Sequence, residues 1–504
     1  MYCPQAARTS ASVVLLTSLC FLAQCAPPSA AVPPGIEDAL NGIHASSLRD
    51  DLKFIASDEL EGRDSPSKGL DRAADYIADQ FRRAGLEPAV GDSYFQTASM
   101  ILEQPDFPHF ELNFASGRSR FQAKPSDVFF DFSNALDLTN APLFKLDLAD
   151  AGQLQHLTKE QVQGKVVMAA FDRRLMRRLE AAEPVLRSGA PALVILVDRK
   201  GMTTEYRRNR RLIDPAQPPS KTRQPRVFVA GDRVADFWEA LKPGTGATAT
   251  FHFAPLRTPA TLRNVIGVLR GSDPALRSTA VLLTAHYDHL GMKPEGPGDR
   301  IYNGANDNGS GTVSVMEVAR ALARLPRHPR RSIVFMTFFG EEEGLIGSHY
   351  YAQHPVWPLA KTIADLNLEQ VGRTDSSEGP EFSNASLTGF DYSGLTRFVQ
   401  DAGKSTGIKV YKDPQGSDPY FQDSDNFSLA EVGVPAETLC VAFQFPDYHA
   451  VGDEWQKIDY DNMAKVDRAI ALSMFLMADS EQAVRWNESN PKTAPYVKAA
   501  KQLK

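Results

Sequence analysis

The chain has 504 residues, of which 42% are hydrophobic and 23% are charged. This is an ordinary globular composition, and the length suggests two or three domains with room for a sizeable core. The net charge of -7 and the isoelectric point near 5.9 argue against a nucleic-acid-binding protein, which normally carries a basic face. Beyond the N-terminus no segment is long and apolar enough for a membrane span.

The first segment, residues 1–31, has the pattern of a signal peptide. Arg8 precedes the apolar run ASVVLLTSLCFLAQC, and the small residues Ser29-Ala30-Ala31 would suit a signal peptidase. We therefore expect an exported protein, periplasmic or secreted. The tetrapeptide LAQC resembles a lipobox, but Gln24 stands where a small residue is usual, so a lipid anchor is the less favoured interpretation.

Two amphipathic helices are expected next, within residues 44–63 and 69–88, where apolar residues recur at helical spacing and Gly85 marks a stop. From 125 to 256 the pattern changes to short β-rich runs, GKVVMAAF, APALVILVD and PRVFVAG, separated by helical stretches rich in arginine. We expect a small inserted α/β domain at residues 125–256, after an N-terminal part of the main domain at 32–124.

The insert also carries two basic runs. They consist of Arg173, Arg174, Arg177 and Arg178, and of Arg207, Arg208, Arg210 and Arg211. Most runs of this kind are solvated faces, and a rim that steers acidic peptides is the functional alternative.

Residues 257–482 follow a rhythm of strand and helix. The expected strands are NVIGVLRG, TAVLLTAHY, RSIVFMTFFG, TIADLNLEQ and VPAETLCVAFQF, and the expected helices are TVSVMEVARALARL and KVDRAIALSMFLMA. Continuous apolar strands alternating with helices indicate the α/β class, with a mainly parallel twisted sheet and helices on both faces. Residues 483–504 are expected to form a C-terminal tail, and Cys440 is the only cysteine after the leader, so no internal disulfide is expected.

Histidines and acids gather at the ends of the expected strands. They are His286, Asp288 and His289 after the second strand, Glu341, Glu342 and Glu343 after the third, Glu369 after the fourth, Tyr448 and His449 after the fifth, and Asp307 in the turn GANDNGSGT. In parallel sheets functional groups lie beyond the carboxyl ends of the strands, and imidazole with carboxylate is a zinc-type ligand inventory. Each residue alone has a structural alternative: Asp307 could cap a helix, for example, and Glu369 could be a surface acid.

These residues also carry a resemblance to a known family. AHYDHLG, NGANDNGSG, FFGEEEGLIGS, NLEQVGR and FPDYH, in this order, resemble the motifs of family twenty-eight of the metallopeptidases. That family includes co-catalytic zinc aminopeptidases, glutamate carboxypeptidase, glutaminyl cyclase and the transferrin-receptor relatives. The resemblance covers the chain after the leader, and the insert resembles a protease-associated domain.

The resemblance implies a zinc-dependent exopeptidase fold with two Zn²⁺ ions per chain. His286 and Glu369 would hold the first ion, Glu342 and His449 the second, and Asp307 would bridge them. The family usually has Asp where this chain has Glu369, so this ligand would reach further by one methylene.

The resemblance also implies roles for the residues around these ligands. Asp288 would orient His286, since a ligating imidazole usually donates its second N–H. Glu341 would be the general base, and Tyr448 would stabilise the oxyanion. The Asp307–Asn308 peptide would be cis. His289 is expected to be a pocket or structural histidine, and Glu343 only a neighbour.

The sequence thus predicts an exported dinuclear zinc exopeptidase, and we expect an aminopeptidase that removes N-terminal residues from peptides with a metal-activated water. A glutaminyl cyclase, which uses one zinc, and a carboxypeptidase or dipeptidase of the same fold are the alternatives among enzymes. A non-catalytic, receptor-like binding protein is the alternative of another class. A serine hydrolase is disfavoured because Ser310 lies in NGSGT, which is not a nucleophile elbow.

Overall fold

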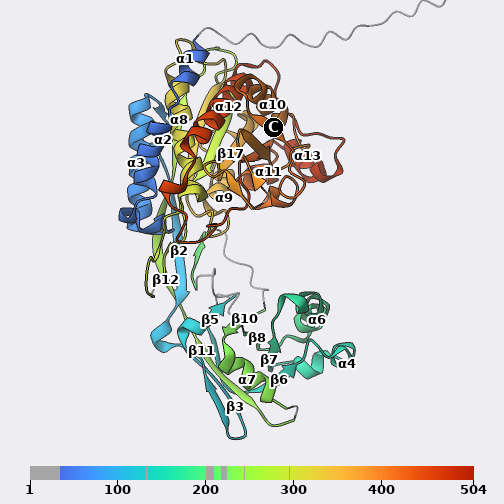
Figure 1. Cartoon of the computed structure of the whole chain (residues 1–504). Coiled ribbons are helices and arrows are strands. Elements are labelled where there is room, and N and C mark those ends of the chain that lie inside the picture. The colour runs from blue at the N-terminus through green and yellow to red at the C-terminus, as the bar shows by residue number, and fades with distance from the viewer. Residues whose placement is uncertain are drawn as a thin grey trace, which may run out of the picture.

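The computed structural model describes residues 35–131, 134–199, 209–216, 224–242, 244–293, 296–377 and 379–503. The signal peptide predicted for residues 1–31 lies outside these ranges and stays a prediction. A larger, helix-rich body and a smaller sheet-rich body are joined by two long strands, β2 (Phe95–Pro105) and β12 (Pro255–Leu269) (Figure 1). The two strands pair antiparallel from Phe95–Val265 to Pro105–Pro255, and this ladder forms the stem of the smaller body.

The larger body is built on a ten-stranded sheet. Its strand order is β21-β20-β22-β17-β13-β16-β12-β2-β9, with β1 beside β12. The bounds are β1 (Glu87–Pro88), β9 (Arg211–Ile213), β13 (Ala280–His286), β16 (Ser332–Phe338), β17 (Thr362–Glu369), β20 (Asn384–Leu387), β21 (Lys409–Tyr411) and β22 (Ala436–Cys440). The four central strands β22, β17, β13 and β16 are parallel, as predicted, whereas β12, β2 and β9 continue the sheet antiparallel.

Helices cover both faces of this sheet, as the continuous apolar strands predicted. Along β16, Ile333 and Phe335 pack into one core, whereas Val334, Met336 and Phe338 pack into the other. The first face is covered by α1 (Ile36–Asn41), α2 (Ala45–Ile55), α3 (Lys68–Ala84), α8 (Gly311–Ala323), α10 (Leu395–Thr406) and α12 (Tyr460–Asp479). The second face is covered by α9 (Ile346–Gln353), α11 (Asn426–Glu431) and α13 (Ala494–Ala500).

The helix α3 shows how local sequence sets these elements. The hydroxyl of Ser67 accepts a hydrogen bond from the Leu70 N–H and caps its first turn. Gly85 ends it in a left-handed conformation, with φ 82°, which a glycine adopts without steric cost. The stop predicted at Gly85 is therefore confirmed.

The smaller body has an eight-stranded sheet in the order β4-β3-β11-β6-β7-β8-β10-β5. Its strands are β3 (Glu111–Ser116), β4 (Ser119–Gln122), β5 (Val128–Phe130), β6 (Leu136–Leu146), β7 (Val166–Ala170), β8 (Leu193–Asp198), β10 (Arg226–Ala230) and β11 (Thr248–Phe253). Its helices are α4 (Ala151–Gln155), α5 (Lys159–Val162), α6 (Met176–Gly189) and α7 (Asp232–Ala240). The hairpin β3–β4 lies before residue 125, so this sheet takes strands from outside the predicted insert.

The C-terminal segment packs against the larger body. Trp486 and Tyr496 are buried and stack with ring centroids 5.1 Å apart, and the indole of Trp486 donates to the carbonyl of Gly433. Much of the segment 483–504, predicted as a tail, therefore belongs to the second core. Across the described ranges, no helix is both long and apolar enough to cross a bilayer.

Candidate active site

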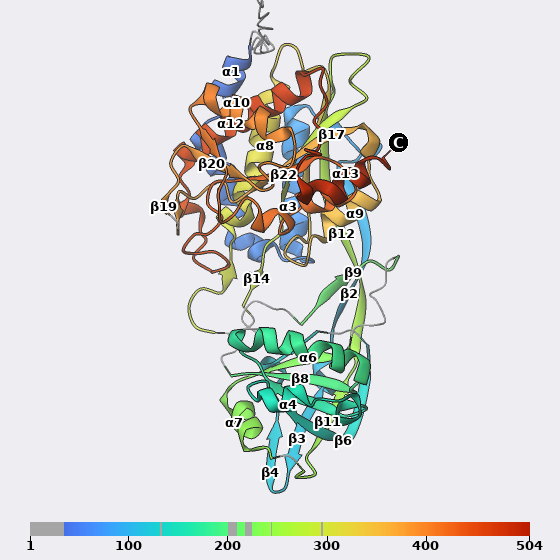
Figure 2. The ribbon, with the colours of Figure 1, turned by 90° about the vertical axis from the view of Figure 1, so that its right-hand side faces the viewer.

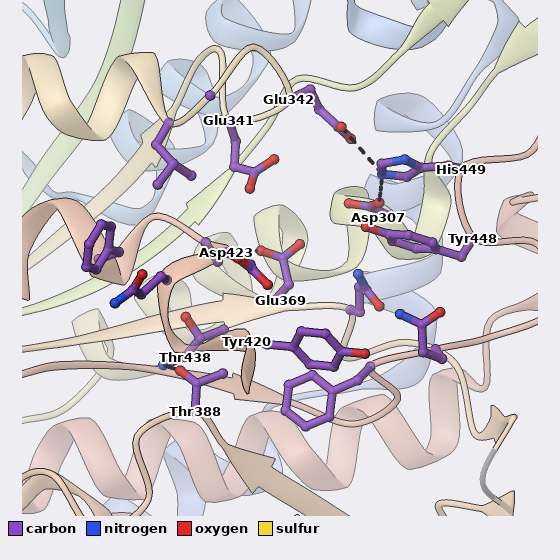
Figure 3. Close-up of a pocket in the computed structure, with 18 of the residues that line it drawn as sticks. Asp307, Glu341, Glu342, Glu369, Thr388, Tyr420, Asp423, Thr438, Tyr448 and His449 are labelled. Carbon is purple, nitrogen blue, oxygen red and sulfur yellow. Dashed lines mark hydrogen bonds and ion pairs between the residues drawn. The ribbon is translucent and has the colours of Figure 1, made fainter. Parts of the chain in front are cut away.

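The predicted site residues meet at the carboxyl ends of adjacent parallel strands. His286 is the last residue of β13 and Glu369 the last of β17, and Glu341 and Glu342 lie just beyond β16. Asp307 lies in the turn before α8. Tyr448 and His449 come from the loop after β22 (Figure 3). The strand order β22-β17-β13-β16 is what brings these distant segments together.

The first group of possible metal ligands consists of His286, Asp307 and Glu369. Each offers one ligand atom, and these atoms lie within 4.8 Å of one another. The Nε2 atom of His286 is 3.0 Å from Oε1 of Glu369 and 3.5 Å from Oδ1 of Asp307. One imidazole nitrogen and two carboxylates facing a common point suit a divalent cation such as zinc.

The second group shares Asp307 and contains two histidines. Nε2 of His449 is 3.1 Å from Oδ2 of Asp307 and 3.4 Å from Oε2 of Glu342. Nδ1 of His289 is 2.7 Å from Oε1 of Glu342, and the ligand atoms of His289, Asp307 and Glu342 also lie within 4.8 Å of one another. His289, predicted as a pocket or structural histidine, therefore contacts a predicted ligand directly.

Asp288 and its contacts orient the first group. Nδ1 of His286 lies 3.3 Å from the carbonyl oxygen of Asp288 and 3.5 Å from its Oδ1 atom. A proton on Nδ1 would satisfy these acceptors and leave Nε2 as the ligand atom. The Asp288 carboxylate also accepts the Glu341 N–H at 3.1 Å and the Ser65 hydroxyl at 3.2 Å. On the other side, the Ser424 hydroxyl donates to Oε2 of Glu369 at 2.7 Å.

The turn that carries Asp307 is fixed by buried hydrogen bonds. The carboxylate of Asp453 accepts the N–H groups of Asn306 and Asp307, each at 3.0 Å. Gly304 has φ 55°, and a Cβ there would lie 2.4 Å from the carbonyl oxygen of Asp307 and from the ring of His289. No larger residue fits this approach. The Asp307–Asn308 peptide bond is cis, as predicted.

A buried arginine ties two of these segments together. The guanidinium of Arg63 donates to the carbonyls of Tyr287 at 2.8 Å, Asn303 at 2.7 Å and Gly304 at 2.9 Å. These carbonyls belong to the segments that carry His286 and Asp307. Burial lowers the pKa of Arg63 to about 10 while nearby carboxylates, Asp288 first, oppose the shift, so the guanidinium stays charged at neutral pH.

The protonation of the central groups results from this crowding. Burial raises the pKa of Glu341 well above its usual value, and the negative charges of Glu342 and Glu369 act in the same direction. Burial also raises the pKa of Asp307, but hydrogen bonds from His286 and His449 outweigh it and hold the pKa well below the usual value. Burial raises the pKa of Glu369 as well, so Glu341 and Glu369 are both acids of this cluster whose environment favours taking up a proton.

A cavity of about 550 Å³ opens beside the two groups. Its walls include Leu345, Phe427, Phe443, Tyr420 and Asp423 in addition to the acids of the site. Tyr448 also lines it, and its ring stacks on His449 with centroids 4.0 Å apart (Figure 3). Among the described residues that line this cavity there is no lysine or arginine, and apart from His349 and His449 its charged side chains are acids.

Several supporting residues were not predicted from the sequence. They are Arg63, Ser65, Asp423, Ser424 and Asp453. Arg63 and Ser65 lie in the run LEGRDSPSKG, between the two early helices. The charged, glycine-containing turn at that point is the feature of the sequence that could have indicated these two residues.

Comparison with known proteins agrees with this geometry. Residues 264–474 match the model of peptidase family M28. Aminopeptidase YwaD of Bacillus subtilis (strain 168) is 26% identical over 366 residues, which cover 70% of this chain and 69% of YwaD. A protein of Pyrenophora tritici-repentis named "Probable zinc metalloprotease" is 34% identical over 294 residues, which cover 46% of this chain and 58% of that protein.

Solved structures show the same fold. The aminopeptidase from Aneurinibacillus sp. strain AM-1 superimposes with a TM-score of 0.59 at 19% identity, covering 90% of this chain and 97% of that one. BSAP, a zinc aminopeptidase from Bacillus subtilis, gives a TM-score of 0.57 at 20% identity, with coverage of 88% and 97%. The predicted α/β exopeptidase fold is therefore confirmed.

Proposed function

We propose that the protein is a zinc aminopeptidase that uses two metal ions to remove N-terminal residues from peptides. One observation carries the proposal: two ligand groups share Asp307 beside a cavity with an acidic wall. The match to the peptidase family M28 model and the aminopeptidases among the relatives support the same class of enzyme.

The residues present fit a pair of zinc ions. We propose that His286, Glu369 and Asp307 hold the first ion, and that Glu342, His449 and Asp307 hold the second. His449 is preferred to His289 because its Nε2 atom faces both Asp307 and Glu342, whereas Nδ1 of His289 is engaged in a hydrogen bond with Glu342. When bound, such ions polarise the substrate carbonyl and lower the pKa of a coordinated water.

Glu341 is the proposed general base. It lines the cavity, its carboxylate is 3.9 Å from Nε2 of His286, and it belongs to neither ligand group. Its raised pKa lets it take a proton from the attacking water and pass it to the leaving amine. The Asp288 carboxylate accepts the Glu341 N–H and so fixes the backbone of the base.

Tyr448 is proposed to donate its hydroxyl proton in a hydrogen bond to the oxyanion that develops on the scissile carbonyl. Burial raises the pKa of this phenol, and the carboxylates of Asp307 and Glu342 raise it further, so the group stays protonated and able to donate. The stacking of its ring on His449 limits the positions that the hydroxyl can reach.

The acidic wall favours the N-terminus of a peptide over its C-terminus. An α-ammonium group is attracted by carboxylates such as Asp423 and Glu369, whereas a terminal carboxylate would need a cation that the described lining does not offer. A carboxypeptidase is therefore the weaker alternative. A glutaminyl cyclase is also weaker, because it would need one zinc and here two ligand groups are present.

The test compares substrates with free and blocked ends. We expect zinc-loaded protein to hydrolyse leucyl anilide but not its N-acetylated form. N-blocked peptides with a free C-terminus should remain intact. Metal analysis should find about two zinc ions per chain, the number that two ligand groups sharing one carboxylate can hold. Turnover of N-blocked peptides from their C-terminal end would refute the assignment, and so would one tightly bound zinc with cyclisation of N-terminal glutamine.

Two parts of the proposal rest on sequence patterns. We propose that residues 1–31 direct export, and that the smaller body, whose sheet runs from β3 to β11, is a protease-associated domain attached to the peptidase. Cleavage of the leader in an exporting host, mapped by N-terminal sequencing of the mature chain, tests the first part.

A further inference from the structure

A short piece of the insert lies on the peptidase body. The strand β9 (Arg211–Ile213) falls within the predicted insert, yet it pairs antiparallel with β2 at the edge of the large sheet, with Ile213 opposite Ile101. Figure 2 shows β9 beside β2 in the region between the two bodies. The residue before this strand, Arg210, is therefore held close to the peptidase site.

Arg210 makes a partly buried ion-pair network there. Its Nη2 atom contacts the carboxylate of Asp64, Oε1 of Glu343 at 3.0 Å and the carbonyl oxygen of Ser65 at 3.1 Å. The side chains of Arg210, Asp64 and Glu343 are only 17%, 21% and 10% exposed. The sequence pattern grouped Arg210 with a solvated basic run, which the low exposure of its side chain contradicts, and Glu343, expected to be only a neighbour of the site, is its ion-pair partner.

The partners of Arg210 hold the loop that carries the proposed base. Glu343 comes directly after Glu341 and Glu342. The Ser65 hydroxyl accepts the Gly340 N–H at 3.1 Å and donates to the Asp288 carboxylate at 3.2 Å. Asp288 in turn accepts the Glu341 N–H at 3.1 Å. The contacts of Arg210 thus reach this loop from both sides, through Glu343 and through Ser65.

We propose that Arg210 is a positioning residue for the Glu341–Glu342 loop, supplied to the active site by the insert. Three consecutive carboxylates repel one another, and Arg210 gives the third a fixed partner, so that the first two keep the geometry needed for base and ligand. The insert is attached to the peptidase body, and through Arg210 it also affects catalysis. The inference about kcat rests on the proposed peptidase function, whereas the inference about metal affinity does not.

The test uses variants of the full-length chain. Arg210→Met removes the charge and keeps the apolar stem, and Arg210→Lys keeps the charge but loses the planar fork that can contact several oxygens at once. Arg211→Met is the matched control: Arg211 is the next residue and begins β9, but it pairs with Glu103 of β2 at 3.0 Å and not with Glu343. Each variant is assayed for leucyl anilide turnover, for zinc affinity by chelator competition, and for its thermal midpoint.

We expect Arg210→Met to lower kcat about 10–100-fold and to weaken zinc binding about 10-fold or more, the range seen when groups supporting metal ligands are lost. KM should change little, and Arg210→Lys should recover part of kcat. Glu343→Gln should give a smaller loss in the same direction, because it leaves the contacts of Arg210 with Asp64 and Ser65, and the double variant should be no worse than Arg210→Met alone.

The results separate positioning from general stability. If Arg210→Met matches Arg211→Met in kcat and in zinc affinity, the inference is overturned. The same holds if the thermal midpoint falls while zinc affinity per folded chain is unchanged. Should Arg210→Met fail to fold, Arg210→Lys carries the test, and a wild-type kcat and zinc affinity in that variant overturn the inference. If no chain hydrolyses any substrate, the proposed function fails, and the zinc affinities still decide whether Arg210 positions the loop.

Discussion

Each of the two sheets of this protein contains a run of parallel strands, but the residues at the ends of those strands differ between the sheets. In the larger sheet, β13 and β17 end at His286 and Glu369, and β16 leads into Glu341 and Glu342. In the smaller sheet, β7, β8 and β10 end at Ala170, Asp198 and Ala230. Within the described residues, both groups of possible metal ligands belong to the larger sheet. Parallel strands bring residues together, and the side chains at their ends decide whether a site results.

The two sheets also differ in how buried charge is supported. The larger sheet has several buried acids at one edge, and backbone N–H groups donate hydrogen bonds to them. The Glu341 N–H donates to Asp288, for example, and the Asp307 N–H donates to Asp453. The larger sheet also has the buried cation Arg63 nearby. Among the described residues at the corresponding edge of the smaller sheet, the buried acid is Asp198. Burial of an ionised group is costly unless it is paired, so the supports in the larger sheet are expected to be as sensitive to substitution as the ligands.

The largest difference between the sheets should appear when their strand-end acids are removed. Asp307→Ala should abolish binding of both metal ions and reduce turnover by at least about 10³-fold, because one carboxylate serves both groups. Asp198→Asn, in the smaller sheet, should keep both ions and turnover near the wild-type level. Metal content per chain and anilide hydrolysis measure both effects. Loss of one ion only from Asp307→Ala would contradict a shared ligand.

The next largest effect concerns Glu341, which is expected to move a proton and not to bind metal. Glu341→Gln keeps the shape of the side chain and removes its basicity, so kcat should fall about 10²–10⁴-fold while both metal ions stay bound. Steady-state kinetics and metal analysis of the same preparation provide the measurement. A variant that retains wild-type kcat would remove Glu341 from the mechanism.

Much of this arrangement could be predicted from the sequence, because the information is local. The strands β13 and β16 are largely apolar runs, and histidine or acidic residues mark or directly follow their ends, whereas β17 carries Asp365 and Asn367 among its apolar residues before it ends at Glu369. The strand-and-helix rhythm then predicts parallel order, and parallel order predicts that His286, Glu341 and Glu369 meet. The contacts of His286 with Glu369 and of His449 with Asp307 agree with that prediction.

The remaining features depend on packing between distant segments. Arg63 reaches the carbonyl of Tyr287, which lies 224 positions away, and Arg210 reaches Glu343, 133 positions away. Neither residue differs in local pattern from a surface arginine. The antiparallel continuation by β12, β2 and β9 was not apparent either, because an apolar strand has the same sequence signature in either direction.

The two histidines at the second group provide a finer test of which residues near the strand ends bind metal. His449→Ala should lose one metal ion and most of the turnover, since Nε2 faces both Asp307 and Glu342. His289→Ala should keep both ions and bind the second about 10-fold more weakly, because it removes only a group that orients Glu342. Titration of apo protein with zinc distinguishes the two variants. A reversal of these results would make His289 the ligand.

The smallest expected effect comes from an acid that lies on no strand end. Asp423 lines the cavity from the loop between Gln422 and Ser424, and partial burial raises the pKa of its carboxyl. If it attracts the substrate's ammonium group, Asp423→Asn should raise KM about 3–10-fold and leave kcat nearly unchanged, because an exposed charge pair contributes only about 1 kcal/mol.

Added salt should raise KM for the wild-type enzyme more than for Asp423→Asn, since the ions screen this attraction. Asp391→Asn is the control, because that exposed acid pairs with Lys412 and does not line the cavity. Equal KM values for Asp423→Asn and Asp391→Asn would mean that the strand-end acids alone select the N-terminus. A higher KM for Asp423→Asn would instead show that substrate recognition extends beyond the strand ends to the loops that wall the cavity.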